Sequence, residues 1–201
     1  IVGKGCYFND KGIDVSEIAK ETLTAKNGTI MMWLKPQSFE TRQYPLFGVA
    51  KDGSDYNRFY IQIETAQTYK NGITKGDRIR TFRGIKPVAN IDLIENPQLN
   101  NWYHVAMTWS TDNSGNTQLK GYLNGEQIGV DKTFESNSID GKFFLGGKTT
   151  TLELYNGYID EPKFEDSAIS SAEIYNYYNE IVNPTPVPDE EKDMFNIVRN
   201  D

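Results

Sequence analysis

The sequence predicts an all-β fold in which two antiparallel sheets stack as a sandwich or jelly roll, followed by one short helix. Two observations lead to this prediction. Short runs that alternate apolar and polar residues recur along the chain with polar turns between them, and strands do not alternate with helices as they do in parallel sheets. A chain of 201 residues with this pattern is long enough to form one core, so we expect a single domain.

Each predicted strand has a period near two and ends at Gly, Asn, Asp or Pro. Between two such runs lies the pair Asn124-Gly125, which readily takes the positive φ angles of a type I′ turn and predicts an antiparallel hairpin. A second turn is expected over residues 112–116, which are polar and contain glycine. The predicted strands cover residues 28–36, 58–64, 103–109, 118–125 and 142–147.

One helix is predicted near the end of the domain. Ser170 and Glu173 form the S-x-x-E pattern of a capping box, and the segment AEIYNYYNEIV follows until Pro184 interrupts it. We therefore place the domain at residues 1–183. Residues 184–201 are predicted to be a Pro-rich acidic linker and the start of a following segment, because they cannot bury enough apolar surface to fold.

Composition excludes several classes of protein. A net charge of −7 disfavours nucleic acid, since a phosphate backbone attracts an excess of Lys and Arg. Cys6 is the only cysteine, so neither an intrachain disulfide nor a thiolate zinc site can form. No apolar run is long enough to span a membrane, so we expect no membrane insertion. The N-terminus lacks the order of a signal peptide, and we interpret the chain as part of a longer multidomain protein.

The order of motifs along the chain resembles a known family. That family is the concanavalin A-like lectin/glucanase superfamily, in its laminin G-like branch. The resemblance implies a concanavalin A-like jelly roll of two antiparallel sheets, with Trp33 and Trp102 packed between the sheets. The segments that carry it are CYFNDKGIDVS (6–16), GTIMMWLKP (28–36), NNWYHVAMTW (100–109), GYLNGEQIG (121–129), FFLGG (143–147) and GYIDEPKFEDSAISSAEI (157–174).

The resemblance also implies a structural calcium ion (Ca2+). Its predicted side-chain ligand is Asp160, with Asn9 or Asp10 nearby, because calcium takes hard oxygen ligands in irregular geometry. Pro162 departs from the family pattern, and since proline removes a ladder donor, the strand is expected to be bulged or at an edge here. The alternative is that Asp160 and Glu161 only cap a turn or face water.

The sequence lacks the residues of a glucanase. Those enzymes carry E-x-D-x-x-E on one strand, which places two carboxylates on one face, and this chain has no such spacing. His104 stands alone without a Ser or Cys motif, so it is interpreted as structural. We therefore predict that the domain is not an enzyme, although it can serve as an accessory domain of one.

A sugar-binding site is predicted in the segment 52–90, which is rich in aromatic, amide and arginine side chains. Arg78 and Arg80 share a strand face, and a planar guanidinium pairs with a carboxylate, so an acidic sugar such as sialic acid is a specific candidate. The alternative is that the arginines form salt bridges with Glu64, Asp77 or Glu95. The candidate ligand-binding residues are Tyr56, Asn57, Arg58, Tyr60, Arg78, Arg80 and Arg83.

These observations predict a non-catalytic carbohydrate-binding or adhesion module of a larger protein, placed outside the cell or on a cell or virion surface. The segment IDVSEIAKETLTAKNGTIMMWLKP also resembles the opening of sialidase-associated lectin domains. The alternative function is a structural or protein-docking spacer in a multidomain enzyme or phage fibre. A glycoside hydrolase is the least favoured of the three.

Overall fold

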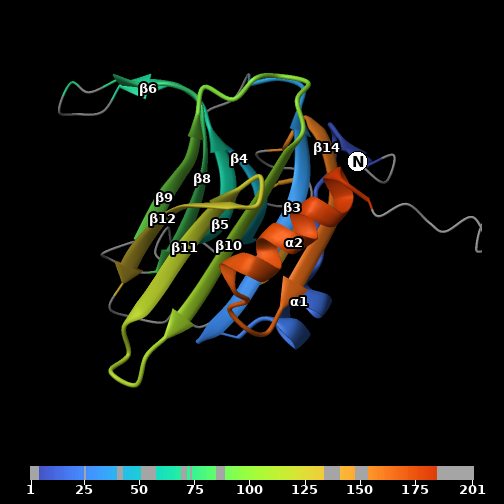
Figure 1. The fold of residues 1–201 in the computed structure, drawn as a ribbon. Coiled ribbons are helices and arrows are strands. Elements are labelled where there is room, and N and C mark those ends of the chain that lie inside the picture. Colours follow the sequence, from blue (N-terminus) through green and yellow to red (C-terminus); the bar gives the residue numbers. More distant parts are fainter. Residues whose placement is uncertain are drawn as a thin grey trace, which may run out of the picture.

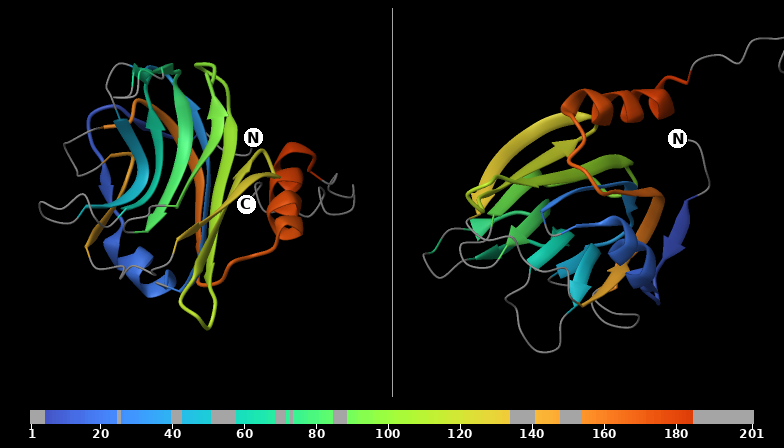
Figure 2. Two further views of the ribbon diagram at one scale, coloured as in Figure 1. Left: turned by 90° about the vertical axis from the view of Figure 1, so that its left-hand side faces the viewer. Right: turned by 90° about the horizontal axis from the view of Figure 1, so that it is seen from below.

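The computed structural model describes residues 5–24, 26–39, 43–50, 58–68, 72, 74–84, 89–133, 141–147 and 154–184. These form two six-stranded antiparallel sheets that stack face to face, which confirms the predicted sandwich (Figures 1 and 2). The first sheet has the order β1 (Cys6–Phe8), β14 (Gly157–Glu165), β3 (Asn27–Pro36), β10 (Tyr103–Thr111), β11 (Thr117–Leu123), β12 (Glu126–Thr133). The second has the order β2 (Ile13–Asp14), β13 (Lys142–Leu145), β4 (Gln43–Ala50), β5 (Arg58–Glu64), β8 (Arg78–Gly84), β9 (Ala89–Glu95).

The core lies between the two sheets and follows the alternation of each strand. Inward-facing residues of the first sheet meet inward-facing residues of the second, and all of them are shielded from solvent. This burial of apolar area is the main stabilising contribution to such a sandwich. The core includes Ile30, Met32, Leu34, Val105, Met107 and Trp109 from the first sheet and Ile61, Ile63, Ile79, Ile91 and Leu93 from the second.

The predicted turns are confirmed. Asn124 and Gly125 have φ angles of 49° and 82° and join β11 to β12 as an antiparallel hairpin. In the turn between β10 and β11, Oδ1 of Asp112 accepts hydrogen bonds of 2.9 Å from the backbone N–H groups of Ser114 and Asn116. Two further short strands, β6 (Gln67–Thr68) and β7 (Thr74–Lys75), form a separate two-stranded ribbon.

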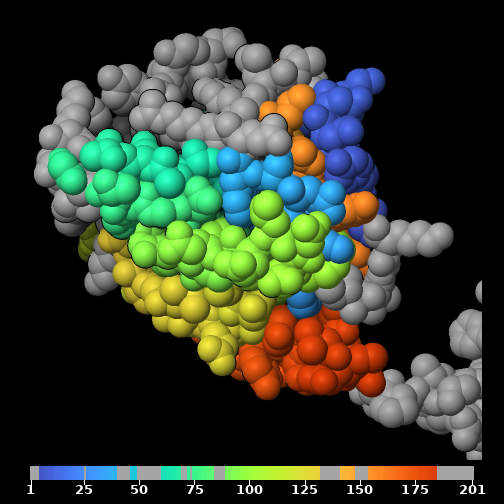
Figure 3. Space-filling model, turned by 90° about the horizontal axis from the view of Figure 1, so that it is seen from above, coloured from blue at the N-terminus to red at the C-terminus, as the bar shows by residue number. Residues whose placement is uncertain are grey.

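The predicted helix is α2 (Ser171–Val182), which lies across the outer face of the first sheet (Figure 2). Its capping box is complete: the Glu173 N–H donates to Oγ of Ser170 at 3.2 Å, and the Ser170 N–H donates to Oε2 of Glu173 at 2.7 Å. Ile174 packs on Met31 and Ala106, which point outward from the sheet. Figure 3, a view onto one end of the molecule, shows α2 as a layer beyond the first sheet.

A second helix, α1 (Ser16–Thr22), was not predicted from the sequence. The Ser16 N–H donates to Oδ1 of Asp14 at 3.0 Å, and Ala19 is buried in the core. Seven residues are too few for helix propensity to be stabilising alone, so packing of Ala19 and Leu23 against the sandwich accounts for this helix.

Two expectations about tryptophan are wrong. Trp33 is buried but points out of the sandwich, since its neighbours in β3 occupy the core. Trp102 is half-buried and lies beside Tyr158, with their ring centroids 6.3 Å apart. The tryptophan in the core is Trp109, which is fully buried.

β14 contains the predicted irregularity around Pro162. Its register against β3 shifts between Asp160 and Lys163, and Glu161 has a φ angle of 48°. The expected bulge is therefore confirmed. No helix among the described residues has the length and apolar character needed to cross a membrane. Residues 185–201 lie outside the described part of the chain.

Candidate functional site

A cluster of charged side chains lies on the outer face of the second sheet. In β5 and β8 the residues Ile63 and Ile79 point into the core, so by alternation Glu64, Arg78 and Arg80 point to the opposite face. The register places Glu64 opposite Arg78, and Arg80 opposite Asp92 of β9. We call Glu64, Lys75, Arg78, Arg80 and Asp92 the arginine cluster.

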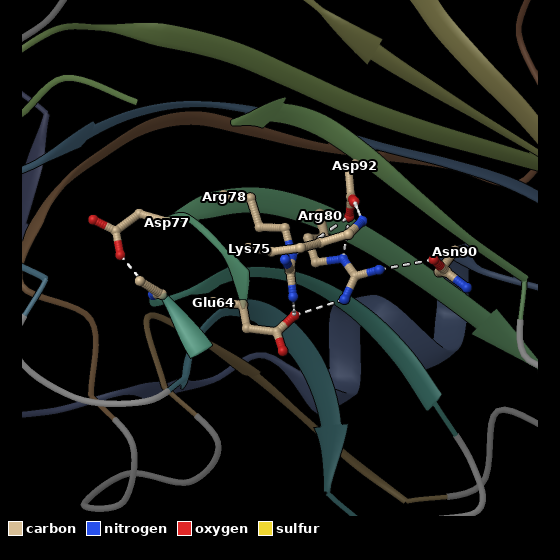
Figure 4. Close-up of polar contacts among 8 residues, drawn as sticks. Glu64, Lys75, Asp77, Arg78, Arg80, Asn90 and Asp92 are labelled. Atoms are coloured by element: carbon tan, nitrogen blue, oxygen red, sulfur yellow. Dashed lines mark hydrogen bonds and ion pairs between the residues drawn. The ribbon is translucent and has the colours of Figure 1, made fainter. Parts of the chain in front are cut away.

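The two guanidinium groups share the carboxylate of Glu64. Nη2 of Arg78 lies 3.0 Å from Oε2 of Glu64, and Nη1 of Arg80 lies 2.6 Å from the same oxygen (Figure 4). Charge-assisted contacts of this length are among the stronger polar interactions in proteins. Glu64 therefore fixes the positions of both arginines.

Asp92 joins the cluster from the other side of Arg80. Its Oδ2 accepts a hydrogen bond of 2.9 Å from Nζ of Lys75, and its Oδ1 pairs with Nε of Arg80 and lies 3.7 Å from Nε of Arg78. Arg80 also donates from Nη2 to Oδ1 of Asn90 at 2.8 Å. The planar group of Arg80 is thus held along several edges at once (Figure 4).

Solvent exposure divides the cluster into a buried and an accessible part. The side chains of Arg78 and Glu64 are 0% and 6% exposed. Arg80 and Asp92 are 11% and 21% exposed, and Lys75 is 39% exposed. A ligand on this face meets Arg80, Lys75 and Asp92 first, with Arg78 and Glu64 beneath them. Three cations against two anions leave the cluster with an excess of one positive charge.

The cations act on the ionisation of Asp92. Burial raises the pKa of this carboxyl, but the hydrogen bond from Lys75 and the charges of Arg80, Lys75 and Arg78 together outweigh burial. The pKa of Asp92 is therefore lowered from its ordinary value. The carboxylate stays ionised at neutral pH and continues to orient Arg80.

Two aromatic side chains lie on the same face as the cluster. The guanidinium carbon of Arg80 lies 4.7 Å from the ring centroid of Phe82, and Phe82 is opposite Tyr60 in the register of β5 and β8. Stacking of this kind stabilises a guanidinium plane. Tyr60 is half-buried, so part of its surface faces solvent beside the charged groups.

Of the predicted ligand-binding residues, Arg78, Arg80 and Tyr60 are brought to one face. Arg83 is not: it is buried between the sheets, with its guanidinium carbon 5.7 Å from a ring centroid of Trp109, and burial lowers its pKa to about 10. Arg83 is three residues from Arg80 in β8, so strand alternation directs its side chain to the opposite face of the sheet. Tyr56 and Asn57 lie outside the described residues, and of Arg58 only the backbone is described.

Sequence reasoning missed Lys75, Asn90 and Asp92. Asn90 and Asp92 alternate with apolar neighbours that belong to the core, so period-two alternation in the segment ANIDLIE was the signal that would have found them. The alternative prediction of salt bridges is confirmed for Glu64. Asp77 instead accepts a hydrogen bond of 2.7 Å from the Ala66 N–H.

The predicted calcium ligands do not converge. In the register of β1 and β14, Cys6 lies opposite Ile159 and Phe8 opposite Gly157. Asn9 and Asp10 therefore follow the end of β1 that lies farthest from Asp160, since Phe8 at that end is already about 10 Å away along the strand at ~3.3 Å per residue. Within the described residues, no three His, Cys, Asp or Glu side chains are grouped to hold a metal ion. Calcium binding stays a prediction.

Asp160 itself forms a short local contact. Its Oδ1 accepts a hydrogen bond of 3.1 Å from the Glu161 N–H, as in the alternative that it caps a turn. Its Oδ2 is buried and has no hydrogen-bond partner among the described residues.

His104 is fully buried on the outer face of the first sheet. Its ring packs against aromatic side chains: the centroids of Trp33 and Tyr177 lie 5.3 Å and 5.7 Å from its own. These surroundings agree with the structural interpretation of this histidine.

Comparison with known proteins identifies the family. Residues 9–175 match the laminin G family model described as the concanavalin A-like lectin/glucanases superfamily. A search of the curated proteins found no match.

Several solved structures have the same fold. The CBM40 domain of the Ruminococcus gnavus IT-sialidase, solved with bound alpha2,3 sialyllactose, is 18% identical, with a TM-score of 0.64 over 88% of this chain and 97% of that one. The NanB sialidase of Streptococcus pneumoniae is 19% identical, with a TM-score of 0.64 over 86% of this chain, which spans only 27% of that enzyme. Domain 4 of the Geobacillus stearothermophilus arabinanase AbnA, solved with arabinotriose, is 20% identical, with a TM-score of 0.52 over 77% of this chain and 66% of that one.

Proposed function

The chain belongs to the laminin G-like branch of the concanavalin A-like lectin/glucanase superfamily, and from this premise we propose that it is a non-catalytic carbohydrate-binding module. We place its ligand on the outer face of the second sheet, over the arginine cluster. The ligand class that this surface fits is a glycan with an acidic sugar.

The geometry of Arg80 is the single observation that carries the proposal. Glu64, Asp92 and Asn90 hold its guanidinium in one orientation, and the cluster carries an excess positive charge. A pre-oriented guanidinium loses little conformational entropy when it pairs with a carboxylate. The exposed Lys75 supplies a second cation beside it, and the exposed Asn90 supplies an amide for hydroxyl groups.

The similar structures support a glycan ligand. The Ruminococcus gnavus domain was solved with a sialylated sugar, and the arabinanase domain with a neutral one. An acidic sugar is favoured here because the accessible groups include two cations. The accessible polar groups of the arginine cluster stay partly hydrated, so we expect affinities in the millimolar to high micromolar range.

A catalytic role is disfavoured by the state of the carboxylates. Glu64 and Asp92 are both ion-paired with arginines, and the pKa of Asp92 is lowered. A general acid for glycoside hydrolysis needs a raised pKa, so Asp92 does not suit that role, and the Glu64 carboxylate is already paired with two arginines. We infer that the module serves a larger extracellular or surface protein, as an accessory domain or in adhesion, and that it brings that protein to its glycan.

Calorimetric titration of the chain with sialyllactose and with lactose tests the proposal. We expect heat of binding from sialyllactose and little or none from lactose. Arg80→Lys keeps the charge but loses the planar fork, and we expect it to weaken binding at least tenfold. Lys142→Ala, which changes an exposed cation on a different strand, is the matched control and is expected to bind like the parent. Equal binding of both sugars would contradict the acidic ligand, and binding of neither would favour the spacer function.

A further inference from the structure

Helix α2 covers a row of three polar side chains on the outer face of the first sheet. The row consists of Asp160 from β14, Trp33 from β3 and His104 from β10. The register places Asp160 opposite Trp33, and Trp33 opposite His104, so each is the direct cross-strand neighbour of the next. All three point away from the core and toward the helix.

Three ring nitrogens at the centre of this interface form no hydrogen bond with any described residue. Nε1 of Trp33 and both ring nitrogens of His104 are buried without a hydrogen-bond partner among the described residues. Buried polar groups in folded proteins are nearly always paired, and leaving them unpaired is destabilising. The contact between α2 and the sheet is therefore weaker than its apolar area alone implies.

Aromatic rings enclose His104 instead. Tyr178 stacks on Trp33 with an angle of 20° between the rings and 5.5 Å between their centroids. The centroids of Tyr177 and Tyr178 lie 5.7 Å and 6.0 Å from that of His104. Both tyrosines belong to α2, so the imidazole is shielded from solvent only while the helix is docked.

We propose that α2 is a proton-operated latch, docked on the first sheet while His104 is neutral and released when His104 takes up a proton. A protonated imidazole carries two N–H donors, and neither has an acceptor among the described residues while the helix is docked. Release of the helix exposes both donors to water. The proposal does not depend on sugar binding.

The charged groups around the interface do not compensate an imidazolium. Asp160 and Glu161 lie on β14, two strands from His104, with Trp33 between, which is about 10 Å at the ~4.8 Å spacing of strands. Nζ of Lys163, on the same strand, lies 5.2 Å from the ring centroid of Tyr177 and adds a positive charge. Tyr177 is not an anion at neutral pH, because burial and then the charges of Glu161 and Asp160 raise its pKa to about 12.

Burial disfavours the protonated form of His104. It lowers the pKa of the imidazole from 6.5 to about 4. The released form therefore takes up a proton more readily than the docked form as the pH falls from 6.5 to about 4. Each pH unit within this window raises the ratio of released to docked helix by up to about tenfold, and the limit, reached below pH 4, is about 300-fold.

Amide hydrogen exchange of the whole chain at pH 7.5 and 4.5, corrected for intrinsic exchange rates, tests the latch. Protection of residues in α2 is expected to fall about 100-fold at the lower pH, while β5 and β10 stay protected. In His104→Phe, which cannot be protonated, protection of α2 is expected to be the same at both values. If the phenyl ring of His104→Phe prevents folding, His104→Leu is used in its place.

A control variant distinguishes the effect of protonating His104 from that of protonating Glu173 in the helix cap. Protonation of Glu173 also weakens α2 at acid pH, so Glu173→Gln, which keeps the capping geometry without the charge, is expected to retain the loss of protection. The proposal is wrong if α2 and the sheets lose protection together, or if His104→Phe still releases the helix. His104 is the only histidine in the chain, so its single imidazole NMR signal gives a direct titration. A midpoint near 6.5 would also overturn the proposal.

Discussion

Glu64 and Arg78 face each other across β5 and β8, and their side chains form an ion pair of 3.0 Å that is almost closed to solvent. Arg80 reaches the same carboxylate oxygen from the accessible side. Removing one member of a buried pair leaves the other without compensation, so the three side chains depend on one another. Glu64 therefore connects the buried Arg78 to Arg80, which we place in contact with the ligand.

The first prediction concerns the ion pair between Glu64 and Arg78. Glu64→Gln keeps the side chain's shape but removes the nearer of the two carboxylates beside Arg78, and leaves Asp92 at 3.7 Å. We expect it to lower the free energy of unfolding by about 3 kcal/mol, because removing one partner of a buried ion pair is strongly destabilising. Urea unfolding followed by circular dichroism measures the change.

Lys142→Ala is the matched control for Glu64→Gln. Lys142 is 71% exposed and lies 3.8 Å from Asp14, so its ion pair is screened by water. We expect a change within about 0.5 kcal/mol. If the two variants were equally stable, the buried pair would not have the role we assign to it.

The second prediction is the pH dependence of Asp92. Because its folded pKa lies below its ordinary value, its ion pairs stabilise the fold above the ordinary value of 3.8. That contribution is lost as the pH falls through the folded pKa. We expect Asp92→Asn to be less stable than the parent at pH 7, and the difference to shrink toward pH 3. Urea unfolding at both pH values measures it, and a constant difference would contradict the prediction.

The third prediction concerns a close approach in the core. Gly28 lies opposite Trp109 in the register of β3 and β10, and a Cβ atom on Gly28 would overlap the indole ring. We expect Gly28→Ala to cost about 1–3 kcal/mol through overpacking, measured by thermal unfolding. In the Trp109→Phe background the smaller ring leaves room, so the same substitution is expected to cost less. Equal costs in both backgrounds would show that the indole is not the obstacle.

Local patterns predicted much of the fold. The five predicted strands, the Asn124-Gly125 hairpin and the capping box at Ser170 each depend on neighbouring residues, and the structure confirms them. α1 depends on burial of Ala19 against elements distant in sequence, so no local pattern indicated it.

The candidate site was predicted in part, again from a local pattern, which here is strand alternation. Alternation correctly placed Arg78 and Arg80 on one face, and applied further it would have moved Arg83 to the core and added Asp92. It would also have turned Trp33 outward. What covers Trp33 depends on where α2 docks, which is a long-range contact.

The last prediction concerns calcium, which the family resemblance implies and which we propose for Asp160. Its buried Oδ2 has no hydrogen-bond partner among the described residues, so one hard oxygen ligand is available there. Removing an ion that binds only the folded chain destabilises it by about 2.7 kcal/mol at a hundredfold excess over the Kd, which lowers the Tm by roughly 5–10 °C. We expect chelator to lower the Tm of the parent by this amount and to leave Asp160→Ala unchanged. Asp10→Ala, at the other end of the strand pair, is expected to respond like the parent, and a parent melting curve that chelator does not move would rule the ion out.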